Sequence, residues 1–135
     1  MSVVLPQVNL VAIAVAAVVQ FILGWLWYMP SMPTGRLWMR ESGMTTPPAP
    51  SPKLALWLVH ALIAAWVIAV VYTWAGGGGL AAGICIGLIL AVPAATMEIA
   101  GGMTMNSRSA GFIAVQAGFA LVGYGLMGAI IGALS

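Results

Sequence analysis

Four polar side chains lie within otherwise apolar stretches of this sequence, and their chemical types could handle a proton or bind a cofactor. Gln20, His60, Glu98 and Gln116 each fall in a separate hydrophobic stretch. A carboxylate and an imidazole could together pass a proton or hold a cation, and ionisable groups inside a membrane often mark such pathways. His60 is also a weak candidate to ligate haem or a chlorophyll-type pigment, although the chain has no second histidine for bis-histidine ligation.

Two less specialised roles are open for Glu98. Ionisable side chains near a helix end commonly reach the membrane interface, where Glu98 could be an anchor that pairs with Arg108. Alternatively, His60 and the two glutamines could satisfy Glu98 in a hydrogen-bonded layer that fixes the helix register. The sequence therefore leaves the anchor, the layer and the proton- or cation-handling pair as open interpretations.

The elements that position these residues must lie in lipid. Hydrophobic residues make up 63% of the 135 residues and charged residues 4%, compared with roughly 25% charged in soluble domains. A folded soluble chain of this size could not hide so much apolar surface. The net charge of +2 is too small to indicate a nucleic-acid partner, and the single cysteine, Cys85, excludes an intramolecular disulfide.

Four apolar stretches, at about residues 7–28, 54–74, 80–101 and 111–134, are each close to the ~20 residues that a membrane-spanning helix needs. The proline-rich segment 29–53, the flexible "AGGGG" and the polar "MNSRS" connect them. We therefore predict an all-α polytopic membrane protein, a four-helix bundle in which residues 1–135 form one transmembrane domain. Within the first connection, "TGRLWMRESG" could form a short interfacial helix with Leu37 and Trp38 facing lipid, or a plain loop.

The positions of the cations predict how the chain is threaded. The four basic residues are Arg36, Arg40, Lys53 and Arg108, and they fall in the first and third connections. Short loops rich in Lys and Arg remain in the cytoplasm, so both termini are expected on the non-cytoplasmic side of the cell inner (plasma) membrane. The first span lacks the basic start of a cleavable signal peptide and is expected to be retained. With this threading, the four polar side chains all lie in the cytoplasmic half.

Small residues at regular spacing predict where helices pack closely. This helix-packing seam consists of Gly83, Gly87, Ala91, Gly111, Ala114, Gly118, Gly125, Gly128 and Gly132. Because lipid tails are as apolar as leucine, membrane helices associate through such close contacts. The pattern does not identify the partner, which could be a helix of the same chain, a second copy or another membrane protein. Pro93 is expected to kink the third span or to free a carbonyl there.

Both ends of the chain resemble a known family. The stretches "LGWLWYMP", "GRLWMRESG" and "SRSAGFIAVQAGFALVGYGLMGAIIGALS" are similar to the bacterial membrane family of domain of unknown function 1761. The resemblance implies a four-helix inner-membrane protein and carries no known activity or catalytic residues. It also implies a family element at the inner interface, formed by Trp27, Tyr28, Pro30, Trp38 and Met39. The proline-rich stretch before the second span departs from the family pattern.

The sequence contains no metal-ligand cluster, no Ser–His–acid set and no phosphate-binding loop. We therefore expect a non-enzymatic protein without a cofactor, an accessory or scaffolding subunit that contacts lipids and packs through its Gly/Ala faces against itself or other membrane proteins. The alternative is a minimal ion- or proton-coupled transporter or channel that uses Glu98 and His60. A weaker alternative is a haem- or pigment-carrying subunit that binds through His60.

Overall fold

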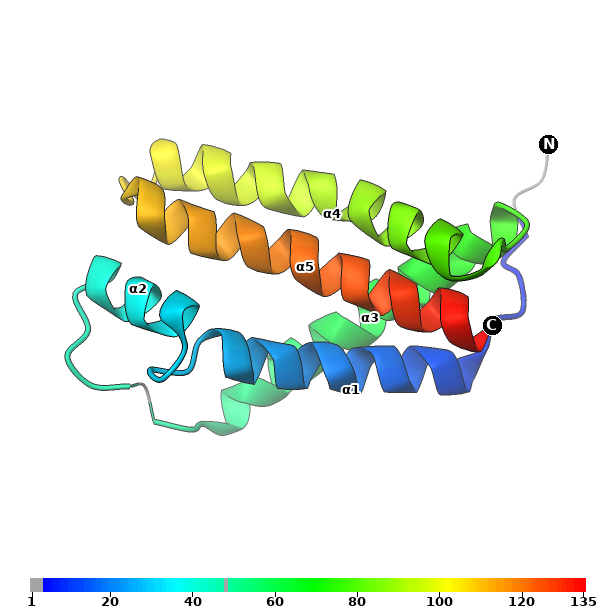
Figure 1. Cartoon of the computed structure of the whole chain (residues 1–135), viewed down its shortest axis with the longest axis horizontal. Helices are drawn as coiled ribbons and strands as arrows, with labels where there is room; N and C mark the ends of the chain where they lie inside the picture. Colours follow the sequence, from blue (N-terminus) through cyan, green and yellow to red (C-terminus); the bar gives the residue numbers. More distant parts are fainter. Residues whose placement is uncertain (1–3, 48) are drawn as a thin grey trace.

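The computed structural model describes residues 4–47 and 49–135, and every regular element within them is helical. The helices, in chain order, are α1 (Leu10–Trp27), α2 (Pro33–Glu41), the 3-10 turn η1 (Pro52–Leu54), α3 (Ala55–Trp74), α4 (Gly79–Met103) and α5 (Ala110–Leu134) (Figure 1). The helices α1, α3, α4 and α5 are long and apolar enough to cross a membrane. The predicted all-α fold with four membrane-spanning helices is confirmed.

Polar side chains outside the helices determine where two spans begin. The side chain of Asn9 accepts a hydrogen bond from the Ala12 N–H at 3.1 Å, and α1 begins directly after it. Ser109 accepts from the Phe112 N–H at 3.2 Å and caps α5 in the same way. Each cap satisfies one of the amide donors that a helix start leaves unpaired. The capping residues explain why α1 begins at Leu10 rather than at residue 7.

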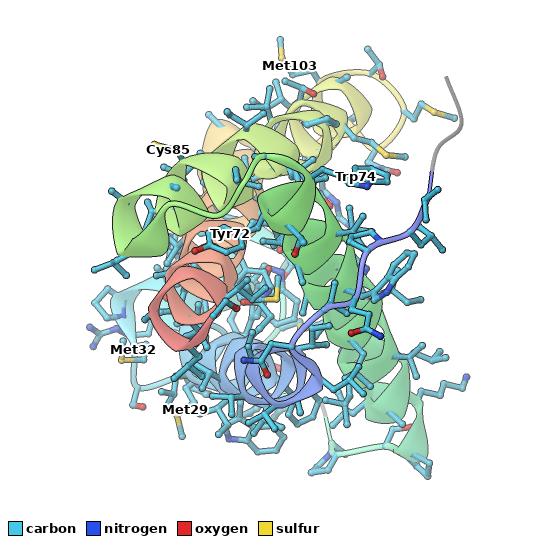
Figure 2. The ribbon with its side chains drawn as sticks, turned by 90° about the vertical axis from the view of Figure 1, so that its right-hand side faces the viewer. Met29, Met32, Tyr72, Trp74, Cys85 and Met103 are labelled. Carbon is cyan, nitrogen blue, oxygen red and sulfur yellow. The ribbon has the colours of Figure 1, made fainter. Side chains whose placement is uncertain are left out.

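A run of glycines reverses the chain between α3 and α4. All four glycines of this run, Gly76 to Gly79, have positive φ, between 76° and 119°. Glycine adopts this backbone conformation readily, whereas it is strained for residues that have a side chain. The hydroxyl of Tyr72 accepts a hydrogen bond from the Gly79 N–H at 2.9 Å and holds the turn against the end of α3. Figure 2 shows Tyr72 inside the bundle, close to this turn.

The short helix α2 packs against the bundle through its apolar residues. Trp38 contacts the Tyr28 ring edge-on, with 5.1 Å between the centroids, and a methyl group added at Gly111 of α5 would lie 3.3 Å from Leu37. Both Leu37 and Trp38 are half-buried, whereas the two arginines of α2 are exposed. The short helix within the first connection is present, and its residues Leu37 and Trp38 are only partly available to lipid, because Leu37 packs toward α5 and Trp38 against Tyr28.

The helices α4 and α5 approach each other so closely that their backbones touch. A methyl group added at Gly83 would overlap the carbonyl oxygen of Gly128, and one added at Gly87 would overlap that of Tyr124. Ala91, one turn further along α4, is fully buried. Close approach of this kind lets two membrane helices gain van der Waals contact along their length.

The other small residues of the predicted seam face three different neighbours. Gly125 and Gly132 also contact α4, whereas Gly118 lies against a tryptophan of α1 and Gly111 against α2. Ala114 is exposed. The small residues of α5 thus allow it to pack centrally among α1, α2 and α4.

The spanning helices are not equally well packed. A buried core forms between α1, α3 and α5, and its members are Ala12, Ile13, Ala16, Ala17, Ala61, Ala64, Ala65, Ile68, Ala69, Tyr72, Met127 and Ile131. The helix α4 runs beside α5, whereas α3 crosses the bundle obliquely and meets α4 near the glycine turn (Figure 1). Figure 2 shows the same divergence of α3 from α4 in a perpendicular view. The divergence leaves the opposite ends of α3 and α4 apart.

Candidate intramembrane polar site

Gln20 is a buried polar side chain on α1 and is 5% exposed. Its amide lies against Gly123 of α5, where an added methyl group would come within 2.5 Å of both Oε1 and Nε2. Oε1 has no hydrogen-bond partner among the described residues. An amide acceptor left without a partner in an apolar environment costs several kcal/mol on transfer scales, roughly 2–7. Gln20 is therefore a buried polar group whose amide oxygen is unpaired among the described residues.

A second glutamine does have a partner within the chain. The hydroxyl of Tyr28, one residue beyond α1, donates a short hydrogen bond to Oε1 of Gln116 on α5. Beside it, the indole N–H of Trp27 donates to the carbonyl of Val115 at 3.2 Å. The Tyr28 ring also contacts Phe119, with 5.5 Å between the centroids. These contacts fix the end of α1 against the first third of α5.

His60 on α3 is exposed and has one polar neighbour. Its Nε2 lies 3.5 Å from the Tyr124 hydroxyl of α5, a distance at the upper limit for a hydrogen bond. The two rings are tilted at 39°, with 6.3 Å between their centroids. The imidazole is therefore weakly held and is accessible to a molecule that enters beside α3.

A cavity of about 430 Å³ brings three of the four predicted polar residues together. Gln20, His60 and Gln116 line it, along with the hydroxyl-bearing Tyr28. Its aromatic wall consists of Phe21, Trp25, Trp38, Trp57 and Phe119. A smaller hollow of about 210 Å³ also includes His60 and extends to Leu90 of α4 and Tyr124 of α5. The larger cavity thus lies among α1, α2, α3 and α5, whereas the smaller hollow lies among α3, α4 and α5. Together they form a partly polar opening in one half of the bundle.

Glu98 is not among the described residues that line either hollow. Ala82, Ile86 and Leu90 form one ridge of α4 at four-residue spacing, and this ridge packs against the core. The helix continues through its internal proline, so Ala94 and Glu98 are the next members of the ridge. Because α3 has diverged from α4 at this level, Glu98 is exposed.

Glu98 makes no ion pair within the described chain, where the single ion pair joins Arg40 to Glu41 at 3.5 Å. The guanidinium of Arg108 instead lies over the Phe112 ring, 4.6 Å from its centroid. Burial, and to a smaller extent the Glu98 carboxylate, raise the pKa of Tyr28 above its ordinary value. Among the described residues, Glu98 thus has no hydrogen bond to His60 or to either glutamine.

The four cations lie at one end of the bundle. Arg36 and Arg40 are on α2, Lys53 is in η1, and Arg108 is in the turn before α5; all four are exposed. The start of α1 and the end of α5 lie at the opposite end (Figure 1), where Nδ2 of Asn9 donates to the Leu134 carbonyl at 3.0 Å. Which end faces the cytoplasm remains a prediction.

Sequence reasoning missed the two tyrosines as polar partners. The sequence predicts Tyr28 in an interfacial element and favours Tyr124 as a bulky aromatic that fills a gap between helices. Each follows a glutamine by eight residues, Tyr28 after Gln20 and Tyr124 after Gln116. Residues four and eight apart lie close to one helix face, so this repeated spacing could have identified both hydroxyls.

These features define a small polytopic helical membrane protein with a partly polar opening at its cationic end. The family model "Protein of unknown function (DUF1761)" matches residues 11–132, and the chain belongs to this family. The match extends from the first turn of α1 to the last turns of α5, so the resemblance found at both ends of the sequence is confirmed. No curated protein and no solved structure matches the chain.

Proposed function

We propose that the protein is a non-enzymatic subunit of a larger assembly in the cell inner (plasma) membrane, with its cationic end in the cytoplasm. Four of its helices can span a membrane and the connections between them are short, apart from residues 28–54. Any partner must therefore be contacted mainly through helix surfaces within the bilayer.

The observation that carries this proposal is the exposure of Glu98. It lies on a spanning helix, about five residues or ~7 Å before the end of α4, without an ion-pair partner among the described residues. A carboxylate on a spanning helix is costly unless it reaches the interface or another group stabilises it. A partner helix that carries a cation or hydrogen-bond donor at this depth would supply that group and cover the opening between α3 and α4.

The contact surface differs from the glycine seam expected from the sequence. Gly83 and Gly87 are already covered by α5, so they are not free for a second protein. At the other end of α4, Ala94 is partly buried and Glu98 is exposed, so this end of the helix is open to a partner. A symmetric dimer through this surface would bring two Glu98 carboxylates together and repel. These considerations favour a different membrane protein over a second copy.

Transport through Glu98 and His60 draws less support from the geometry. No described hydrogen bond joins the two residues, and Glu98 is not among the residues that line the cavity around His60. A pigment-carrying role would depend on His60 as the only histidine ligand, beside a cavity of about 430 Å³. The partner-subunit role uses the exposed carboxylate directly.

Site-specific photocrosslinking in native membranes tests the proposal. We would place p-benzoylphenylalanine at Ala94, one turn before Glu98, so that the carboxylate is retained, and, as the matched control, at Val92, which is 51% exposed on a different helix face. A discrete crosslinked protein is expected from position 94 and only lipid adducts from position 92. Mass spectrometry then identifies the partner.

The carboxylate itself is tested by substitution, with the crosslinker kept at position 94. Glu98→Gln retains hydrogen-bonding capacity and should preserve the adduct in part, whereas Glu98→Leu should abolish it. A crosslink only to another copy of the chain would mean that the assembly is a homo-oligomer and not a complex with a different protein. Equal adducts from positions 92 and 94 would contradict the proposal.

A further inference from the structure

Half of the aromatic side chains in this sequence line one cavity. The chain contains 6 Trp, 3 Tyr and 3 Phe residues. The cavity of about 430 Å³ is lined by six of them, Phe21, Trp25, Tyr28, Trp38, Trp57 and Phe119. Aromatic walls favour a flat, conjugated ligand, which packs against them face-on or edge-on, whereas an acyl chain has no such preference. The volume lies within the range of roughly 300–1,000 Å³ for small-molecule sites.

The glutamine amides of the cavity wall offer hydrogen-bond donors rather than acceptors. Oε1 of Gln20 is buried against Gly123, and Oε1 of Gln116 already accepts from the Tyr28 hydroxyl. The amide nitrogen of Gln116, in contrast, is not fully buried and has no hydrogen-bond partner among the described residues. A ligand that pairs with this wall must therefore present an acceptor.

The tryptophans of the wall add further donors. Among the described residues, the indole N–H groups of Trp27 and Trp74 make hydrogen bonds to backbone carbonyls. Those of the cavity tryptophans, Trp25, Trp38 and Trp57, have no such bond within the described chain. Because an indole N–H can only donate, these groups also favour a ligand that carries acceptors.

His60 supplies a polar group at a separate point of the same cavity. In a neutral imidazole one nitrogen carries a proton, while the other can accept from the Tyr124 hydroxyl beside it. Gln116 and Tyr124 are eight residues apart, about 12 Å along α5. A ring with two acceptors on opposite sides can therefore meet the Gln116 amide with one and the imidazole with the other.

The charge and the rim of the cavity indicate where the ligand comes from. No lysine, arginine or carboxylate is among the described lining residues, so a charged ligand would lose its hydration without gaining a counterion. Trp25 and Trp57 are 50% and 61% exposed, and their side of the cavity is open toward lipid. The ligand is thus uncharged and enters from the bilayer.

We propose that this cavity binds the head group of a membrane quinone. A quinone head is a flat, conjugated, uncharged ring with two carbonyl acceptors on opposite sides, and its isoprenoid tail is soluble in the bilayer. One carbonyl accepts from the Gln116 amide and the other from His60, while the tail leaves beside Trp57. Glu98 takes no part in this site, so the quinone site and the partner contact can be tested independently.

The experiment uses the full chain in phosphatidylcholine nanodiscs with an azidobenzoquinone that carries a decyl tail. After photolysis, peptide mapping should place the label on segments of α1, α3 and α5 that line the cavity. Excess decylubiquinone should compete, whereas decylbenzene, which has the same tail and a ring without carbonyls, should not. A prenylated naphthoquinone used as a second competitor shows which size of quinone ring the cavity prefers.

Three variants locate the binding determinants. Gln116→Leu removes the amide donor and should reduce site labelling about tenfold, the loss expected for one good hydrogen bond. Tyr28→Phe breaks the same Tyr28–Gln116 bond but keeps the amide, so it is the matched control and should label nearly as the wild type does. His60→Leu, at an exposed position, should reduce labelling without disturbing that pair. It tests the site independently if Gln116→Leu does not fold.

Four results would overturn the proposal. Competition by decylbenzene as strong as that by decylubiquinone would exclude a role for the carbonyls. Equal losses in Tyr28→Phe and Gln116→Leu would mean that the Tyr28–Gln116 bond only maintains the structure. Unchanged labelling in folded Gln116→Leu and His60→Leu variants would exclude both donors. Label spread over peptides away from the cavity would mean that the quinone only partitions into the bilayer.

Discussion

Tyr28 and Gln116 show how a polar group is accommodated inside this apolar chain. The Tyr28 hydroxyl donates a hydrogen bond to Oε1 of Gln116, and the Tyr28 ring packs against Trp38 and Phe119. Because burial raises the pKa of Tyr28, the hydroxyl remains protonated, and therefore a donor, throughout the neutral range. Gln20 lacks such a partner, which makes these two glutamines chemically different although they look equivalent in the sequence.

We expect the Tyr28–Gln116 pair to be measurably coupled. In a double-mutant cycle with Tyr28→Phe and Gln116→Leu, the coupling free energy should be about 0.6 kcal/mol and at most ~1.7 kcal/mol, as for other hydrogen bonds between membrane helices. Unfolding in mixed micelles by a denaturing detergent measures it. Pairing Tyr28→Phe with Gln20→Leu provides the control cycle and should give no coupling. Additivity in both cycles would mean that the hydrogen bond does not stabilise the fold.

At the scale of the helices, the α4–α5 contact depends on glycine at positions where even a methyl side chain would not fit. Gly83 meets a carbonyl of α5 so closely that a methyl group cannot fit, whereas Gly101 of the same helix has its nearest neighbouring atom at 3.9 Å. Two glycines with the same intrinsic helix propensity therefore have opposite structural roles.

Gly83→Ala should destabilise the protein by roughly 1–3 kcal/mol, because the overlap forces the two backbones apart. Gly101→Ala should be neutral or slightly stabilising, since alanine favours the helix and has room there. Thermal unfolding of the two purified variants in the same detergent compares them directly. Similar losses for both would indicate that helix propensity, rather than backbone contact, determines the effect.

Much of the helical arrangement follows from local signals in the sequence. The apolar run 54–74 and the observed helix Ala55–Trp74 differ by one residue, since hydrophobic length, the preceding prolines and the following glycines define both ends. The direction of α3 was not predictable from such signals. It depends on how Ala61, Ala64 and Ala65 pack against α1 and α5, and the resulting divergence separates Glu98 from the residues in the cavity. The position of a polar residue along its helix could thus be predicted from the sequence, whereas the neighbours that it meets across the bundle could not.

At the scale of the whole molecule, the basic residues make the two ends of the bundle different. Arg36, Arg40, Lys53 and Arg108 are all exposed at the same end, and the glycine turn lies at the other (Figure 1). A distribution this uneven favours one orientation during membrane insertion.

Cysteine labelling tests that orientation in intact cells. In a Cys85→Ser background, Ala75→Cys in the glycine turn should react with a membrane-impermeant maleimide, whereas Thr104→Cys near Arg108 should react only after the membrane is permeabilised. Both positions are exposed, so accessibility within the protein does not limit either reaction. The reverse pattern would place the cations outside the cytoplasm and would refute the proposed threading.

The contact between Gln20 and Gly123 also has a consequence for biosynthesis. Gln20 leaves the ribosome with the first spanning helix, but the glycine that shields its amide belongs to the last. Because synthesis proceeds at roughly 5–20 residues per second, the Gln20 amide remains unshielded in the insertion machinery or the lipid for several seconds. During that interval we expect water in the translocon, or an insertase, to shield the amide until α5 packs against it.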